Sequence, residues 1–387
     1  MSVPEPSFTV GIEEEYLLVD LETRDLVDDP PPGLMAVCEE ALEGRVSPEF
    51  LRSQIEIGTP VCGSLDEARV QLCLLRSTVA GVARRFGLGL IAASTHPFAK
   101  WTAQHFTDKE RYRAIAEDYQ VVARRLVICG MHVHVGIEDD ELRADLLNQG
   151  AYFLPHLLAL STSSPFWQGD QTGLKSYRLS VFEELPRTGL PPQFASFSEY
   201  QRSVDVMVRA GLVEDATKLW WDLRPSARFP TLEMRIADVC PLLEDAISIA
   251  ALYRCILRML YRLRRNNQRW RSYPAFLINE NRWRAQRYGV GGDLVDYGRG
   301  EMIPFSDLAQ ELLELVREDA HFFGCMRQVE HTLKIVETGT SADRQIARYK
   351  ALKEQGADET EALKGVVDLI MEETLVGTEE CVAEPVS

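Results

Sequence analysis

Apolar and polar residues alternate in four short stretches of the chain: GIEEEY, SQIEIG, GMHVHVG and TLEMRIA. In a β-strand successive side chains point to opposite faces of the sheet, so each stretch is expected to be a strand with one apolar and one polar side. Met131 and Val133, for example, share one face, whereas His132 and His134 share the other. The pattern predicts one sheet with an apolar face and a charged face.

Helical spacing of apolar residues predicts the rest of the architecture. Ser64 is expected to cap a helix that ends near Gly87, with Glu67 at the capping-box position. Residues 282–292 are basic and punctuated by glycine, which predicts a loop. Further helices are expected over residues 108–126, 141–160, 197–210 and 241–265, and a set of helices over residues 305–373.

The chain shows no internal repeat and no Gly/Ser-rich linker. The pattern therefore favours an α+β fold, in which a mainly antiparallel sheet has a polar active-site face and carries helices on its other face. We expect residues 1–376 to form a single catalytic domain and residues 377–387 to be an acidic, disordered tail.

Composition narrows the classes of partner and compartment. The net charge of −17, from 59 acidic and 42 basic residues, disfavours nucleic acid and anionic membranes as partners. The N-terminus lacks a basic segment followed by an apolar one, and no apolar run approaches the length of a membrane span, so a cytoplasmic protein is expected. Eight scattered cysteines without a CxxC pair predict reduced, buried thiols and no zinc cluster.

The charged face of the predicted sheet carries an unusual set of side chains. Carboxylates that converge on one surface are costly to bury without cations, and hard divalent ions prefer oxygen ligands. The excess of carboxylate disfavours zinc. The alternative to a metal site is that the four strands are unrelated and half-exposed. The candidate ligands, enough for two or three ions, are Glu13, Glu15, Glu49, Glu56, His132 and Glu233.

Three arginines follow or accompany these strands: Arg178, Arg224 and Arg235. A planar guanidinium binds phosphate or carboxylate oxygens through two hydrogen bonds, although each arginine could equally form a structural ion pair. Both the GxGxxG and the GxxxxGK[ST] phosphate loops are missing from the sequence. A bound nucleotide is therefore expected to lie on the sheet.

Six motifs occur in one order: GIEEEY, an E-x6-E that ends in SQIEI, GMHVHVG, SYR, WWDLRPS and TLEMRIADV. In this order they resemble the bacterial type 2 glutamate-cysteine ligase family, the YbdK-like carboxylate-amine ligases. The signals are also similar to those of glutamine synthetase, whose catalytic fold that family shares. The resemblance spans about residues 8–292, and beyond residue 303 only helical pattern is available.

The resemblance implies an ATP-dependent carboxylate-amine ligase. In such enzymes ATP phosphorylates a substrate carboxylate, and an amine then displaces the phosphate to form an amide, with Mg²⁺ or Mn²⁺ neutralising the phosphates. It implies that His134 lies near the nucleotide, that the six candidate ligands hold metal and that the three arginines contact phosphoryl groups or the substrate carboxylate. The residues that it places near the amino-acid substrate are His96, Tyr112, Tyr177, Asn281 and Arg282.

Other classes of enzyme remain alternatives. One is a phosphotransferase that acts on a guanidino group, and another is a metal-dependent hydrolase that uses His132 and His134 without a nucleotide. The expected partners are a small carboxylate or amino acid and an amine, with a homodimer as an option. Glu14, which alternation places on the opposite face from Glu13 and Glu15, is expected to form an ion pair there.

Overall fold

The computed structural model describes residues 4–378 and Cys381. One seven-stranded sheet runs through it in the order β10-β11-β5-β1-β3-β2, and β4 pairs with the far end of β1. All the pairs within this sheet are antiparallel. Its strands are β1 (Val10–Asp20), β2 (Val46–Pro48), β3 (Gln54–Gly58), β4 (Leu88–Ile91), β5 (Met131–Gly136), β10 (Leu223–Pro225) and β11 (Thr231–Met234).

The four alternating stretches of the sequence become the neighbouring strands β3, β1, β5 and β11, as predicted. The register brings their polar residues together, because Glu13 lies opposite His132 and Glu233 lies opposite His134. In the same way Glu15 lies opposite Glu56 on β3. The α+β class with a mainly antiparallel sheet is confirmed.

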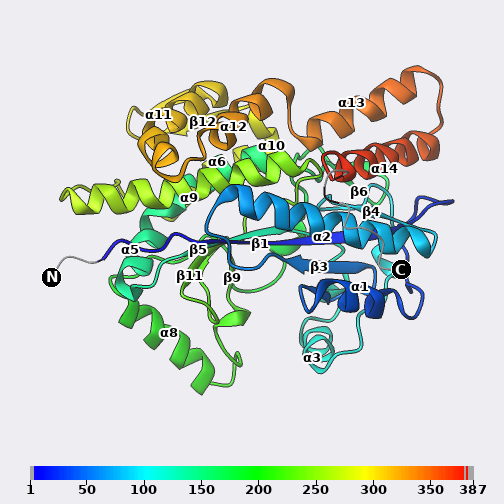
Figure 1. Ribbon diagram of the computed structural model, residues 1–387, viewed down its shortest axis with the longest axis horizontal. Coiled ribbons are helices and arrows are strands. Elements are labelled where there is room, and N and C mark those ends of the chain that lie inside the picture. Colours follow the sequence, from blue (N-terminus) through cyan, green and yellow to red (C-terminus); the bar gives the residue numbers. More distant parts are fainter. Residues whose placement is uncertain (1–3, 379–380, 382–387) are drawn as a thin grey trace.

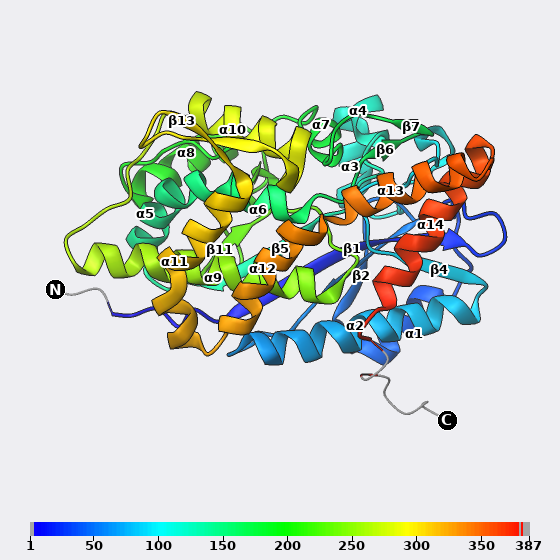
Figure 2. The same cartoon turned by 90° about the horizontal axis from the view of Figure 1, so that it is seen from above.

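Two long helices cover the apolar face of the sheet: α2 (Leu65–Arg85) and α9 (Leu243–Arg265) (Figure 1). Most of α9 is buried, because further helices pack on its outer side (Figure 2). These helices are α6 (Leu154–Ser161), α11 (Phe305–Phe323) and α12 (Met326–Thr338), and α10 (Ala275–Tyr288) packs on α6. Helix α14 (Glu359–Leu375) packs beside β4 and against α13 (Ser341–Glu354).

On the other side of the sheet lie α3 (Glu110–Tyr119) and α8 (Phe197–Arg209) (Figure 1). This side is more open than the helix-covered one. The remaining elements are short: α1 (Leu34–Leu42), α4 (Val121–Arg124), α5 (Asp140–Gly150), α7 (Arg178–Phe182), β6 (Phe166–Trp167), β7 (Asp170–Gln171), β8 (Thr188–Gly189), β9 (Trp220–Trp221), β12 (Asp293–Asp296) and β13 (Glu301–Pro304).

Three predicted elements differ from the structure. The prediction of a loop over residues 282–292 is wrong, because α10 continues to Tyr288. The glycines of this stretch begin only after the helix, at Gly289, which has a positive φ. The helix expected over residues 108–126 breaks at Gln120, whose φ is also positive. The helix expected over residues 141–160 is interrupted by a 3₁₀ turn just before Pro155, whose ring nitrogen cannot donate a hydrogen bond.

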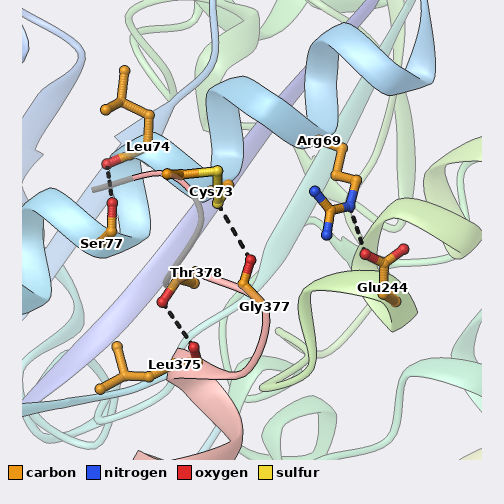
Figure 3. Close-up of a disulfide and its surroundings, with 9 residues drawn as sticks. Arg69, Cys73, Leu74, Ser77, Glu244, Leu375, Gly377 and Thr378 are labelled. Carbon is orange, nitrogen blue, oxygen red and sulfur yellow. Dashed lines mark hydrogen bonds and ion pairs between the residues drawn. A yellow bond between two sulfur atoms is a disulfide. The ribbon is translucent and has the colours of Figure 1, made fainter. Parts of the chain in front are cut away.

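The prediction that all thiols are reduced is wrong for one pair. Cys73 of α2 forms a disulfide with Cys381, and their Cα atoms are 6.0 Å apart (Figure 3). Because 308 residues separate the two cysteines, only the return of α14 toward α2 brings them together. The other six cysteines form no disulfide and are buried, as expected.

The C-terminal segment is placed only in part. Thr378 is buried and its amide donates to the carbonyl of Leu375, so the chain from residue 377 to residue 378 follows α14 directly. The rest of the tail that was predicted to be disordered, residues 379–380 and 382–387, lies outside the described residues. In the part of the chain that the structure describes, no helix has both the length and the apolarity needed to cross a membrane.

Candidate active site

The polar face of the sheet forms the floor of a cavity of about 260 Å³. One wall comes from α3 and from Phe50, and another comes from residues 217–229. The floor carries all the predicted metal ligands and all three predicted arginines: Glu13, Glu15, Glu49, Glu56, His132, His134, Arg178, Arg224, Glu233 and Arg235. The tertiary structure therefore gathers into one cavity residues that lie up to 222 positions apart in the sequence, from Glu13 to Arg235.

The first group of possible ligands comes from three adjacent strands. Glu13, His134 and Glu233 each offer one ligand atom, and these atoms lie within 4.8 Å of one another. The Nδ1 atom of His134 is 2.9 Å from the hydroxyl of Thr231, which fixes the orientation of the ring. Its Nε2 atom is buried 3.5 Å from Oε1 of Glu13 and has no hydrogen-bond partner among the described residues.

The second group consists of carboxylates alone. Glu15, Glu49 and Glu56 offer oxygen atoms that also lie within 4.8 Å of one another. Burial and the charge of Glu49 raise the pKa of Glu15 to about 7, and burial together with the neighbouring carboxylates raises the pKa of Glu56 well above its ordinary value. Burial and mutual repulsion thus both disfavour the charged carboxylates, and a bound cation would favour their charged form.

His132 lies between the two groups. Its Nδ1 atom is 3.3 Å from Oε2 of Glu13, and its Nε2 atom is 3.9 Å from Oε1 of Glu15. Burial, with a further contribution from the charge of Arg235, lowers the pKa of His132 to about 4. The ring is therefore neutral at pH 7, and it bridges the two acidic groups without adding a positive charge.

Two of the arginines use their hydrogen bonds within the protein. Arg224 forms two bonds with the carboxylate of Glu233, of 2.9 and 3.1 Å, and donates to two backbone carbonyls as well. Arg178 donates to the carbonyls of residues 235–237 at 3.2 to 3.3 Å. Burial lowers the pKa of both guanidinium groups. Both side chains therefore brace the floor of the cavity.

Arg235 differs from the other two arginines. One terminal nitrogen contacts Glu233 and lies 3.4 Å from Nδ1 of His132, whereas its buried Nε atom has no partner among the described residues. Burial opposes ionisation of Glu233, but the charges of Arg235 and Arg224 outweigh it and hold the pKa of this carboxyl below its usual range. A fixed cation with an unused N–H group thus lies at the edge of the first acidic group.

The donor chemistry of both groups suits hard divalent cations. Five carboxylates supply oxygen, and the free Nε2 atom of His134 supplies one nitrogen. Such a donor set is typical of Mg²⁺ or Mn²⁺ and not of a structural zinc site. Among the described residues no thiol belongs to either group.

The predicted substrate residues are only partly brought to the cavity. Tyr112 lines it, and its hydroxyl donates to the carbonyl of Pro48. His96 lies in a turn, where Nδ1 accepts hydrogen bonds from the amides of Phe98 and Ala99 at 3.2 and 3.0 Å. Tyr177 packs against the hydrophobic core outside the cavity lining.

Asn281 and Arg282, the other two predicted substrate residues, lie on α10 and are buried away from the cavity lining. Asn281 exchanges two hydrogen bonds with the backbone of Val295 at 2.7 and 2.8 Å. Arg282 forms ion pairs with Asp222 and Glu183. Both residues are therefore used to fasten α10 to neighbouring segments, which their position in the sequence did not reveal.

Sequence reasoning also missed several residues of the site. Thr231, the partner of His134, could have been found, because it precedes Glu233 by two positions and so shares its face of the strand. The apolar part of the lining carried no such signal, since it comes from separate loops and helices. It consists of Phe50, Ile115, Leu126, Ile128, Phe182, Leu185, Trp220, Ala227 and Phe229.

Comparison with known proteins identifies the family. A profile described as "Glutamate-cysteine ligase family 2" matches residues 9–368. The chain belongs to this family. A relative from Rhodospirillum rubrum, provisionally named glutamate–cysteine ligase 2, is 61% identical over 375 residues, which cover 96% of both chains. A relative from Sorangium cellulosum with the same provisional name is 46% identical over 376 residues, which cover 96% of this chain and 97% of the relative.

Two solved structures share the fold of this glutamate-cysteine ligase family 2 protein. A bifunctional glutathione synthetase from Pasteurella multocida matches with a TM-score of 0.67 and 15% identity, over 95% of this chain and 52% of that one. A glutamate–cysteine ligase from Francisella tularensis in complex with AMP matches with a TM-score of 0.65 and 14% identity, over 98% and 95% of the two chains.

The family membership confirms the class of reaction that the motifs predicted. The protein is an ATP-dependent carboxylate-amine ligase. Neither alternative class, the guanidino phosphotransferase or the hydrolase that works without a nucleotide, is supported by any of these comparisons.

Proposed function

We propose that this ligase joins the γ-carboxyl group of glutamate to the amino group of cysteine. The observation that carries the chemistry is the pair of acidic groups on one sheet face, next to Arg235 with its unused N–H. The provisional names of its relatives favour glutamate and cysteine as the substrates. We further propose the cytoplasm, where ATP and Mg²⁺ are abundant, as its place of action, and the homodimer stays a prediction.

We assign one divalent cation to each acidic group. Glu13, His134 and Glu233 would hold the first, and Glu15, Glu49 and Glu56 the second. This assignment exchanges the roles expected for the two histidines, because it is Nε2 of His134 that lies unpartnered within the first group. When bound, the cations would neutralise the phosphates of ATP and make the γ-phosphorus more electrophilic.

The reaction then needs two transfers. A carboxylate oxygen of the first substrate attacks the γ-phosphorus, which forms an acyl phosphate and releases ADP. The nitrogen of the amine attacks the acyl carbon, phosphate leaves, and the nitrogen loses its proton to give the amide. Arg235 is suited to bind the phosphoryl oxygens in both steps, because its charge is fixed by Glu233 and its Nε–H has no acceptor among the described residues.

Other residues of the cavity have supporting tasks in this proposal. Arg224 holds the carboxylate of Glu233 in a two-point ion pair, so that its orientation is set before a cation binds. His132, neutral and buried, spaces Glu13 from Glu15. Tyr112 stays a candidate for contact with the amino-acid substrate, whereas His96, Tyr177, Asn281 and Arg282 leave the proposed site.

The test is a screen for ADP release. The purified protein is incubated with ATP and Mg²⁺, and pairs of amino acids are offered as carboxylate and amine donors. We expect release above the ATP-only rate with glutamate plus cysteine, together with a product whose mass equals the sum of both minus one water. Release of ADP without an amide product would contradict the proposed reaction. An amide formed from another pair of amino acids would contradict glutamate and cysteine as the substrates but would agree with the proposed mechanism.

A further inference from the structure

Arg178 crosses the start of strand β5 at a point where only a glycine leaves room for it. A Cβ atom added to Gly130 would lie 2.4 Å from one terminal nitrogen of Arg178 and 2.8 Å from its central guanidinium carbon. Heavy atoms do not approach a real Cβ so closely. At Gly11, on the neighbouring strand, an added Cβ would meet its nearest atom at an ordinary 3.8 Å. Among the glycines of the described residues, only Gly130 would bring an added Cβ this close to a guanidinium group.

The guanidinium of Arg178 has little freedom to yield. It is buried, lies 5.6 Å from the ring centre of Phe182, and donates to the carbonyls of residues 235–237. The next residue, Asp238, is held as well, because it accepts hydrogen bonds from the amide of Ser163 and from the hydroxyls of Ser164 and Ser176. Moving Arg178 would take the hydrogen-bond donor away from the carbonyls of Arg235 and Ile236, which is unfavourable for buried polar groups.

The segment that Arg178 braces carries Arg235, whose carbonyl accepts from both terminal nitrogens of Arg178. The backbone of Gly130 also contacts the floor of the cavity, because its amide donates to Oε2 of Glu15 at 2.7 Å. One small residue thus connects a carboxylate of the second acidic group with the segment that positions Arg235.

We propose that Gly130 is a positioning residue of the ligase. The missing side chain gives Arg178 the room to hold residues 235–237, and this contact keeps Arg235 aligned with the transferred phosphoryl group. The inference rests on the proposed role of Arg235. It assigns no contact with substrate to Gly130 or to Arg178.

A double-variant cycle tests the inference with Gly130→Ala, Arg178→Ala and the combination of both. Alanine keeps the amide that binds Glu15, so the cycle isolates the contact with Arg178. We expect Gly130→Ala to lower kcat about 10- to 100-fold with little change in KM for ATP, because misplacement of about 1 Å can cost about 100-fold in rate. The double variant should be no slower than Arg178→Ala alone. Multiplicative losses, or a wild-type rate for Gly130→Ala, would overturn the proposal.

Gly81→Ala is the matched control, because an added Cβ at this position of α2 meets no atom within 4 Å. It should leave kcat unchanged. The melting temperature of each variant gives a second readout that needs no turnover. If Gly130→Ala does not fold, the double variant should fold as well as Arg178→Ala, and its failure to do so would overturn the proposal.

The two readouts also separate this inference from the proposed function. If the wild type forms no amide from any pair of substrates, the proposed function fails, but the melting temperatures still report whether Gly130 and Arg178 are coupled. Coupled stabilities with uncoupled rates would show a contact that does not act on catalysis, and would overturn the positioning role.

Discussion

Arg76 of α2 and Glu14 of β1 form a two-point ion pair that is sealed from solvent directly behind the floor of the active site. The two bonds measure 2.8 and 2.6 Å, and both side chains are 0% exposed. The hydroxyl of Tyr16 donates to the same carboxylate. Although burial opposes ionisation of Arg76, the charge of Glu14 raises the pKa of this guanidinium above its usual value. Glu14 therefore belongs to the scaffold, although Glu13 and Glu15 beside it belong to the site.

Removal of Glu14 should destabilise the protein without a direct effect on the chemistry. The variant Glu14→Gln leaves the charge of Arg76 buried without its counterion, so we expect a loss of about 3–5 kcal/mol in the free energy of unfolding. Replacement of both residues by leucine should restore much of that loss. Urea unfolding measures both effects, with exposed Glu22→Gln as the control. A single-variant loss below about 1 kcal/mol would contradict the buried pair.

The second acidic group should be needed for turnover but not for folding. Glu56→Gln removes one charged ligand and also relieves repulsion within the group. We expect ADP release to fall at least about 100-fold, because phosphoryl transfer depends on the neutralisation of phosphate charge. The melting temperature without metal should stay the same or rise. Near-normal turnover would remove Glu56 from the proposed ligand set.

Arg235 should matter more than a guanidinium outside the site. We expect Arg235→Ala to lower kcat about 100- to 1000-fold, which is the effect of losing one preorganised donor to a developing negative charge. Arg265→Ala, an exposed position near the end of α9, should have no effect on kcat. Initial rates of ADP release compare the two variants. Equal small effects would make Arg235 a structural ion-pair partner of Glu233.

His96, which lies outside the proposed site, should make the stability of the protein depend on pH. Burial lowers the pKa of His96 from 6.5 to about 4, so between these values the unfolded chain binds a proton that the folded chain does not. The free energy of unfolding should therefore fall as the pH drops from about 6.5 to 4, by up to about 3 kcal/mol from this residue. Above about pH 7 the ring is neutral in both the folded and the unfolded chain, so this titration should no longer change the free energy of unfolding.

The variant His96→Asn isolates this contribution, because all other titrating groups are retained. The difference in unfolding free energy between wild type and variant should change with pH below about 6.5 and be constant above it. His321→Asn, at an exposed position of α11, serves as the control. Parallel curves for wild type and His96→Asn would show that His96 is not buried as a neutral ring.

The disulfide between Cys73 and Cys381 should make stability sensitive to reductant. It closes a loop of about 300 residues, for which the chain-entropy relation gives on the order of 5 kcal/mol as an upper estimate. A reductant should lower the melting temperature of the wild type but not that of Cys381→Ser. Peptide mapping without reductant should recover the linked pair. Identical wild-type melting temperatures with and without reductant would contradict a stabilising cross-link.

Strand periodicity predicted much of the site. The alternation in GIEEEY and GMHVHVG already assigned Glu13, Glu15, His132 and His134 to one face, because a strand has a repeat of two residues. It also separated Glu14 from its neighbours. The sequence could not show which of the two histidines offers a free nitrogen to a cation, because both share a face of the strand. Only the hydrogen-bond partner of each ring distinguishes them.

The substrate predictions show the opposite case. His96 lies in a turn, whereas Asn281 and Arg282 lie at the point where the sequence predicted a loop to begin. Polar residues at such positions are compatible with a binding site or with structural hydrogen bonds. The choice depends on what lies within about 3 Å, here the amides of a turn, the backbone of Val295 and the carboxylate of Asp222. Those partners are far away in the sequence or come from the backbone, which carries no residue-specific signal.

By itself the sequence determined the strands, their polar face, the order of the motifs and the family, because these depend on local periodicity and residue identity. Only the tertiary structure decided which carboxylates form a group, which arginine keeps a free N–H, and how Arg178 passes over Gly130. The physical reason is that strand register, side-chain contacts and clearances of a few tenths of an ångström arise only when distant segments pack against one another.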